Sequence, residues 1–340
     1  MPNKKRTIFT KILIWRYKYI SERQFILVLS VLVGFLAGLG TVLLKYLTLF
    51  IQSVLEGGFI RNYYYSLYFI FPIVGVWLVY LIKKNFLKKE IGHGISTTLY
   101  AISKRSGIIE RYKMFASLMV APITVGFGGS VGLQGPAVST GAAIGSNVAS
   151  MFHMNAKTRM LLIGCATAGA MSSMFKAPVA AIVFAVEIFS LDLVFTSLVP
   201  LLLASVAAVI TSYFFRGTDV LFSFELLDAW RVKDIIFYVF LGVATGIASV
   251  YFSKMYFLIT RFFGWFSNAY VKIGIAALAI GLMLYLFPPL YGEGYGLINN
   301  LLNGNTEAAL SGIQYQIDFN NIWMVIVILL IIAVFKAIAM

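Results

Sequence analysis

Charged residues are scarce in this sequence. Only 12% of its 340 residues are Asp, Glu, Lys or Arg, about half of the ~25% that is usual in soluble globular domains. The whole segment 114–156 contains none of them. A bilayer core, by contrast, needs roughly 20 consecutive apolar residues for each spanning helix. The shortage of charge therefore indicates a polytopic helical membrane protein.

Apolar runs of spanning length recur along the chain. They cover residues 24–44, 62–82, 193–215, 235–253, 273–292 and 319–335, and the segments 114–156 and 160–186 (interrupted only by Lys176) add more. This pattern predicts an all-α fold whose helices cross the membrane.

Acidic residues are rarer than basic ones, 13 against 27. The basic residues are concentrated in residues 1–23 and 83–113, whereas residues 52–61 contain only Arg61. The positive-inside rule then predicts that the N-terminus and residues 83–113 are cytoplasmic, in what we expect to be a bacterial inner (plasma) membrane. Because the positive charge flanks the spans, nucleic acid is not an expected partner. The N-terminal segment has no small-residue cleavage site and is interpreted as retained.

Cysteine and histidine are almost absent. Cys165 is the single cysteine, which excludes an internal disulfide, and the two histidines are His93 and His153. They lie in separate segments, with no HExxH pattern and no Asp-rich run. A polytopic membrane enzyme is therefore disfavoured, and no cofactor and no metal site are expected.

The two halves of the chain resemble each other. Gly34 and Gly38 lie in "LVGFLAGLGTVLLKYLTLFI", and Gly242 and Gly246 lie in the related "FLGVATGIASVYFSKMYFLI". Each is followed by a second apolar span and then by a glycine turn, GHGI at 92–95 and GEGY at 292–295. The loop around the first turn is basic, whereas residues 292–318 contain acids and no Lys or Arg. Opposite charge at equivalent positions predicts an inverted repeat.

Glycine is abundant in one uncharged stretch, "GFGGSVGLQGPAVSTGAAIGS" at 126–146. Glycine-broken spans in inverted repeats are typical of transporters and channels that bind a substrate near the midplane. We predict that the loop 126–136 interrupts a span and that a half-helix starts at Pro136, with its N–H groups and positive dipole end facing an anion. The spacing of Gly141 and Gly145 instead indicates close helix packing.

Three motifs resemble the CLC chloride channel and transporter family. The segment "GGSVGLQGPAVSTGAAIGSN" is similar to the family pattern G-S-x-G-x-E-G-P, "GHGIS" is similar to its anion loop G-S-G-I-P, and "SSMFKAPVAAIVFAVEIFSLDL" is similar to its next helix. The resemblance implies a CLC-like inverted-repeat fold with glycine-broken half-helices, a homodimer, and one anion path in each subunit. It places anion-binding backbone groups at Gly92, His93, Gly94, Gln134 and Gly135.

The sequence departs from the family pattern at three places. Gln134 stands where the family has its gating glutamate, which competes with chloride and carries protons in the exchangers. Ile188, directly after Glu187, stands where the exchangers have a second proton-handling glutamate, which leaves Asp192 as the nearest acid after Glu187. His93 replaces the serine of the anion loop. We therefore expect a channel-like chloride path without proton coupling. Glu187 and His93 each retain a purely structural alternative.

The resemblance also suggests a domain organisation. We expect a basic segment (1–23), a first membrane repeat (24–215), a connecting loop (216–233) and a second repeat (234–340) that is incomplete, because the family's G-x-F-x-P loop does not follow. This interpretation predicts little selective chloride flux through the 340-residue chain alone. Alternatives that remain are a carrier for fluoride or nitrate and a nonfunctional remnant.

Overall fold

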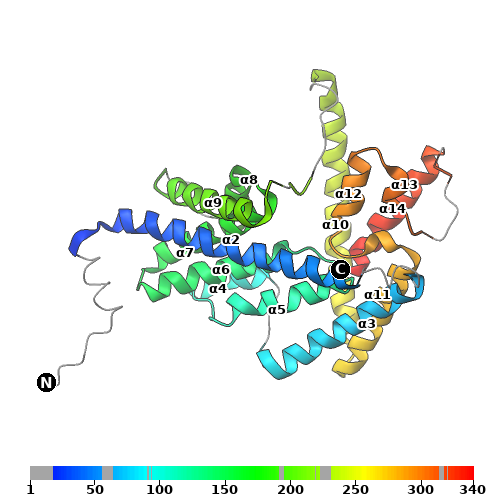
Figure 1. Ribbon diagram of the computed structural model, residues 1–340, viewed down its shortest axis with the longest axis horizontal. Coiled ribbons are helices and arrows are strands. Elements are labelled where there is room, and N and C mark those ends of the chain that lie inside the picture. The colour runs from blue at the N-terminus through cyan, green and yellow to red at the C-terminus, as the bar shows by residue number, and fades with distance from the viewer. Residues whose placement is uncertain are drawn as a thin grey trace. The chain divides into compact units, whose positions relative to one another are not determined.

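The structure is a computed structural model. It describes residues 18–55, 64–89, 92, 94–190, 195–218, 220–222, 231–313, 318–319 and 321–340. Helices make up the regular structure in these ranges, as the sequence predicted, and no strand occurs in them. Figure 1 shows their order along the chain. The helices are α2 (Glu22–Leu55), α3 (Tyr64–Ile82), α4 (Ile95–Lys104), α5 (Lys113–Gly126), α6 (Gln134–Met151), α7 (Ala156–Phe175), α8 (Pro178–Phe189), α9 (Phe195–Arg216), α10 (Ile235–Gly264), α11 (Ala269–Leu286), α12 (Tyr295–Leu302), α13 (Thr306–Ala309) and α14 (Ile322–Ala339).

Six helical segments in the described ranges are long and apolar enough to cross a bilayer. They are Glu22–Leu55, Leu67–Leu87, Ser197–Arg216, Val232–Gly264, Ala269–Leu286 and Ile322–Ala339. Each coincides with one of the uncharged runs, although the run 273–292 is helical only as far as Leu286. Pro288 and Pro289 follow there in a short 3-10 turn, because proline disfavours helical backbone in the residue before it. This is an integral membrane protein.

The chain forms two compact units. One contains residues 1–47, 83–122 and 133–221, and the other contains residues 48–82, 123–132 and 222–340. They are called unit 1 and unit 2 below, and each is described by itself. The repeat boundaries that the sequence suggested stay a prediction.

Unit 1 is built around α7, in which 14 of the 20 residues are buried. Small residues bring α6 against it. A Cβ added to Gly145 would lie 2.3 Å from the backbone oxygen of Leu162, and one added to Gly141 would lie 2.8 Å from that of Ala166. Both distances are too short for any side chain, so the predicted packing role of these two glycines is confirmed.

The glycine pair of α2 also packs in unit 1. A Cβ on Gly34 would lie 2.2 Å from the backbone oxygen of Ala204 in α9, and one on Gly38 would lie 3.0 Å from the Cα of Ala208. Gly242 and Gly246 of α10, their counterparts in the sequence, have no described atom within 4 Å of such a Cβ. The two glycine pairs therefore share a pattern but differ in packing within the described part of the chain.

Unit 2 has a smaller core, in which α11, α14 and the turn after α11 meet. Its buried members are Leu284, Leu290, Leu310, Val325 and Ile332. Helix α3 packs against α11 through a close approach, since a Cβ on Gly281 would lie 2.6 Å from the backbone oxygen of Phe69. This core holds the turn 288–294 in place.

Two polar side chains of α6 anchor the loop that precedes α5. The Ser146 hydroxyl donates to the carbonyl of Gly107 (2.6 Å) and accepts from the backbone N–H of Ile109 (3.0 Å). The Asn147 amide donates to the carbonyl of Ile109 at 3.1 Å. Ser146 and Ile109 are buried, so water cannot easily replace these bonds. Next to them, a hydrogen bond from the Lys89 ammonium (3.1 Å) lowers the pKa of the exposed Glu110 carboxyl.

Replacing Ser146 by alanine should lower the thermal stability of the protein. The change leaves a buried carbonyl and a buried N–H unpaired, which costs about 1–3 kcal/mol for each such group. Thermal unfolding of the detergent-solubilised protein, followed by tryptophan fluorescence, measures the change in Tm. Ser150→Ala is the matched control, because among the described residues the Ser150 hydroxyl bonds only the Ser146 carbonyl of its own helix. Equal Tm values for the two variants would contradict the anchoring role.

Candidate functional site

The glycine-rich segment interrupts the helical path where the sequence predicted a break. α5 ends at Gly126 and α6 begins at Gln134, so residues 127–133 are not helical. Gly128 has a φ of 93°, and a Cβ there would lie 2.8 Å from the ring of Tyr291. Both the backbone angle and the close approach exclude a side chain at this position. The predicted break within 126–136 is confirmed.

The start of α6 differs slightly from the prediction, because Pro136 is the third helical residue instead of the first. Pro136 has no N–H, but the N–H groups of a first turn have no intrahelical carbonyl to bond. The first intrahelical bond runs from the N–H of Ala137 to the carbonyl of Leu133 at 2.9 Å. The helix therefore begins two residues earlier than predicted, at Gln134, and Pro136 is accommodated as its third residue.

The turn before α4 has the unusual backbone that its glycines predicted. Gly92 has a φ of 81°, and Gly94, the N-cap of α4, has a φ of 56°. A Cβ at Gly92 would in addition lie 2.5 Å from the Thr97 hydroxyl oxygen. Glycine is the residue that adopts such angles at little cost. His93, between them, lies outside the described residues.

The two predicted anion loops meet in unit 1. A Cβ added to Gly94 would lie 3.5 Å from the carbonyl oxygen of Gly135, so the first turns of α4 and α6 lie side by side. No described atom lies within 4 Å of a Cβ added to Gly135 itself. Each helix start carries about half a positive charge on its exposed N–H groups. The arrangement can stabilise a small anion without a full positive charge.

The residues around the third motif have separate positions. Glu187 lies in the last turn of α8 and is exposed, whereas Ile188 is partly buried against a core cluster that includes Ala101 and Ile109. Asp192 lies outside the described residues. The Ile188 side chain therefore packs against this cluster, and it has no polar atom that could take up or release a proton.

The second glycine turn shares positive φ angles with the first. Gly292 has a φ of 62°, and Gly294, the N-cap of α12, has a φ of 86°. As in GHGI, two glycines with left-handed φ directly precede a helix start. The ψ angles of the two N-cap glycines differ, however, being −115° at Gly94 and 6° at Gly294, so the equivalence of the two turns stays a prediction.

Three polar groups of unit 2 were missed by the sequence reasoning. The Lys336 ammonium of α14 donates to the carbonyls of Gly292 (2.8 Å) and Leu290 (3.4 Å). The Ser130 hydroxyl donates to the Leu290 carbonyl at 2.6 Å, and the Tyr291 hydroxyl donates to the carbonyl of Gly126. The Ser130 and Tyr291 bonds tie the turn at 288–294 to the glycine loop and to the end of α5, whereas the Lys336 bonds tie it to α14. In the sequence, the only local sign of this arrangement was the single Lys336, directly after the apolar run 319–335.

A family profile described as voltage gated chloride channel matches residues 73–340. The match includes both α4 and α6, whose starts form the candidate site. The chain belongs to the voltage-gated chloride channel family. The resemblance that the three motifs indicated is thereby confirmed.

Two curated proteins are similar to this member of the chloride channel family. A putative chloride channel protein ClcB-like of Ralstonia nicotianae is 26% identical over 68% of this chain and 55% of its own length. The H+/Cl− exchange transporter ClcA of Vibrio cholerae is 26% identical over 84% of this chain and 64% of its own length. The chain therefore spans less than two thirds of the length of either relative.

Solved structures with the same fold come from the chloride channel family as well. A slow cyanobacterial Cl−/H+ antiporter has a TM-score of 0.72 at 19% identity, over 94% of this chain and 75% of its own. A CLC-type fluoride/proton antiporter has a TM-score of 0.68 at 22% identity, over 97% of this chain and 77% of its own. The predicted CLC-like helical fold is confirmed.

Proposed function

We propose that the protein moves chloride across the membrane along a path lined by the first turns of α4 and α6. The observation that carries the proposal is the close approach of Gly94 to Gly135, with open space beside Gly135. On this proposal the binding groups are the backbone N–H groups around Gly92, His93, Gly94, Gln134 and Gly135. The family membership supports it, and the two curated relatives are named for chloride.

The charge of the site supports permeation in preference to tight binding. Conduction requires an anion site that is favourable enough to enter and weak enough to leave. Partial charges at helix starts meet this condition, because each contributes about 0.3–1 kcal/mol at an exposed position. None of the described residues that form the two turns is a lysine or an arginine.

We further propose that transport is not coupled to protons. Gln134 begins α6 beside the proposed anion position, and an amide side chain has no proton to exchange at physiological pH. Ile188, the position of the exchangers' inner glutamate, is apolar and partly buried. The ClcA relative is named as an H+/Cl− exchange transporter, so this protein would work differently from it.

A second candidate within the same chemistry is another small anion. One structural neighbour is described as a fluoride/proton antiporter, and backbone N–H groups donate to fluoride and nitrate as well as to chloride. Competition of these anions for chloride efflux distinguishes the candidates.

We also propose a homodimer with cytoplasmic N-termini in a bacterial plasma membrane. The homodimer rests on the family resemblance, and the orientation rests on the basic residues of 83–113.

Gly135→Ala tests the proposed path. No described atom would lie within 4 Å of the added methyl group, so the fold should persist while the methyl occupies the anion position. Losing about 1–2 kcal/mol of favourable N–H and dipole contacts predicts a fall of roughly 5- to 30-fold in chloride efflux. A chloride electrode measures the efflux from proteoliposomes that contain the full-length protein, in this and in every efflux experiment below.

Gly274→Ala is the matched control for this experiment. Gly274 lies in α11, and there too no described atom lies within 4 Å of an added Cβ. Chloride efflux through this variant should equal that of the unmodified protein. The proposal fails if Gly135→Ala, with an unchanged Tm, transports chloride at the unmodified rate.

A further inference from the structure

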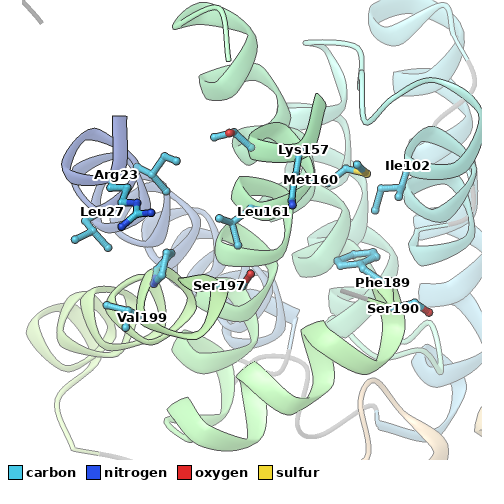
Figure 2. A pocket seen from close by; sticks show the side chains of 13 residues that line it. Arg23, Leu27, Ile102, Lys157, Met160, Leu161, Phe189, Ser190, Ser197 and Val199 are labelled. Carbon is cyan, nitrogen blue, oxygen red and sulfur yellow. The ribbon is translucent and has the colours of Figure 1, made fainter. Parts of the chain in front are cut away.

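A cavity lies in unit 1, lined by other residues than those of the proposed anion path. It has a volume of about 520 Å3 and is lined by residues of α2, α4, α7, α8 and α9. Figure 2 shows Arg23 and Leu27 on one side, Ile102, Phe189 and Ser190 on the other, and α7 residues between them. None of Gly92, Gly94, Gln134 and Gly135 is among its lining residues.

The lining of this cavity is amphipathic. Most of the side chains are aliphatic or aromatic, as Leu27, Leu161 and Phe189 illustrate. Polar character comes from the cations Arg23 and Lys157 and from hydroxyl groups such as those of Ser190 and Ser197. No Asp or Glu occurs among the lining residues that the structure describes, so the described lining combines an apolar wall with two positive charges.

The two cations are available to a ligand. Arg23 and Lys157 are exposed, and neither has a hydrogen bond or ion pair to any described residue. Lys157 lies in the first turn of α7, where the helix dipole adds to the positive potential. A negatively charged group is therefore the complementary occupant of the polar side.

The position in the chain indicates which surface the cavity faces. Arg23 ends the basic segment 1–23, and Ile102 lies in the basic region 83–113, both of which the positive-inside rule assigns to the cytoplasm. The cytoplasmic leaflet carries anionic lipids, and basic pockets between membrane helices on that side bind their headgroups. The charged residues among 1–17 are all Lys or Arg, so their charge does not complement that of Arg23 and Lys157.

We propose that this cavity binds one acidic phospholipid of the cytoplasmic leaflet. An acyl chain lies against Leu27, Leu161 and Phe189, and the headgroup phosphate contacts Arg23 and Lys157. The volume falls within the roughly 300–1,000 Å3 of small-molecule sites. Because the lipid contacts α2, α7, α8 and α9 at once, its binding stabilises their packing.

Binding of phosphatidylglycerol to the purified chain in detergent tests the proposal. The probe carries a photoreactive diazirine in its acyl chain, and phosphatidylcholine with the same acyl chains is the neutral comparison. Native mass spectrometry measures the affinity, and peptide mapping locates the cross-links. We expect one tight phosphatidylglycerol site, weaker phosphatidylcholine binding, and cross-links at residues 160–161 and 189.

Variants separate this site from general attraction to a basic protein. Arg23→Gln with Lys157→Gln should weaken phosphatidylglycerol binding about 30-fold, since each cation near the surface contributes about fivefold. Lys233→Gln with Lys254→Gln removes the same charge at exposed positions outside the cavity and should leave the affinity unchanged. Ser197→Trp, which fills the cavity, should abolish binding of both lipids.

Three results would overturn the proposal. The first is an equal loss of phosphatidylglycerol affinity in the two charge variants, and the second is equal affinity for the two lipids. The third is a set of cross-links confined to segments outside the cavity, as expected if residues 191–194 fill it. The double variant Arg23→Gln/Lys157→Gln keeps the test valid even if Ser197→Trp misfolds, because both of its positions are exposed. Chloride efflux plays no part in these measurements, so they are independent of the proposed transport function.

Discussion

A Gln134→Glu protein should carry little chloride at neutral pH and progressively more as the medium is acidified. Gln134 opens α6 next to Gly135, where we propose that the positive helix starts attract an anion. A carboxylate there competes for the same N–H groups and repels chloride, whereas the protonated acid does neither. A glutamate has a pKa of about 4.3 in water and a higher one when buried. Flux should therefore fall about tenfold for each pH unit above the new carboxyl's pKa.

The measurement is chloride efflux from proteoliposomes between pH 4 and pH 8, about the range in which a partly buried glutamate titrates, with simultaneous recording of proton movement. Gln134→Met, similar in length and uncharged, is the control and should show a flat pH profile like the unmodified protein. The glutamate variant need not exchange protons, because Ile188 remains apolar. Proton uptake driven by a chloride gradient in the unmodified protein would refute the proposed lack of coupling, and a flat profile in Gln134→Glu would refute the proposed anion position.

Gly34→Ala should destabilise the protein strongly for so small a change. The added Cβ would lie 2.2 Å from the Ala204 backbone oxygen, and a backbone atom cannot move aside unless α2 and α9 separate. Overpacking of a well-packed core typically costs about 1–3 kcal/mol. The expected result is a clear fall in Tm and a lower yield of monodisperse protein in size-exclusion chromatography.

Gly242→Ala is the matched control, because Gly242 occupies the equivalent place in the second glycine pair. No described atom lies within 4 Å of a Cβ at this position, and alanine is a better helix former than glycine by about 1 kcal/mol. The Tm of this variant should stay the same or rise. A similar fall in Tm in both variants would contradict the inferred difference in packing between the two glycine pairs.

Several features of the site could be predicted from local sequence. The left-handed φ angles of Gly92 and Gly94 follow from the lack of a Cβ. The helix break before Pro136 follows from the glycine run and from proline's tolerance of a first turn. Such backbone preferences act within a few residues, so no knowledge of distant segments was needed.

Other features depend on residues that are distant in the sequence. Lys336 was an unremarkable lysine near the end of an apolar run, and only the structure shows its ammonium on the carbonyls of Leu290 and Gly292. Ser146 likewise carries no sign in the sequence that it holds the backbone at residues 107 and 109. The partner of a polar side chain is set by how the helices pack.

The sequence by itself determined that this is a helical membrane protein, that its helices break at glycine turns, and that position 134 carries no charge. These properties follow from composition and from local backbone sterics. Only the tertiary structure decided that Gly94 lies against Gly135, that Gly34 packs closely whereas Gly242 has open space around it, and that five helices enclose an amphipathic cavity. Such contacts join segments far apart in the chain, and the complementary shapes of the packed helices determine them.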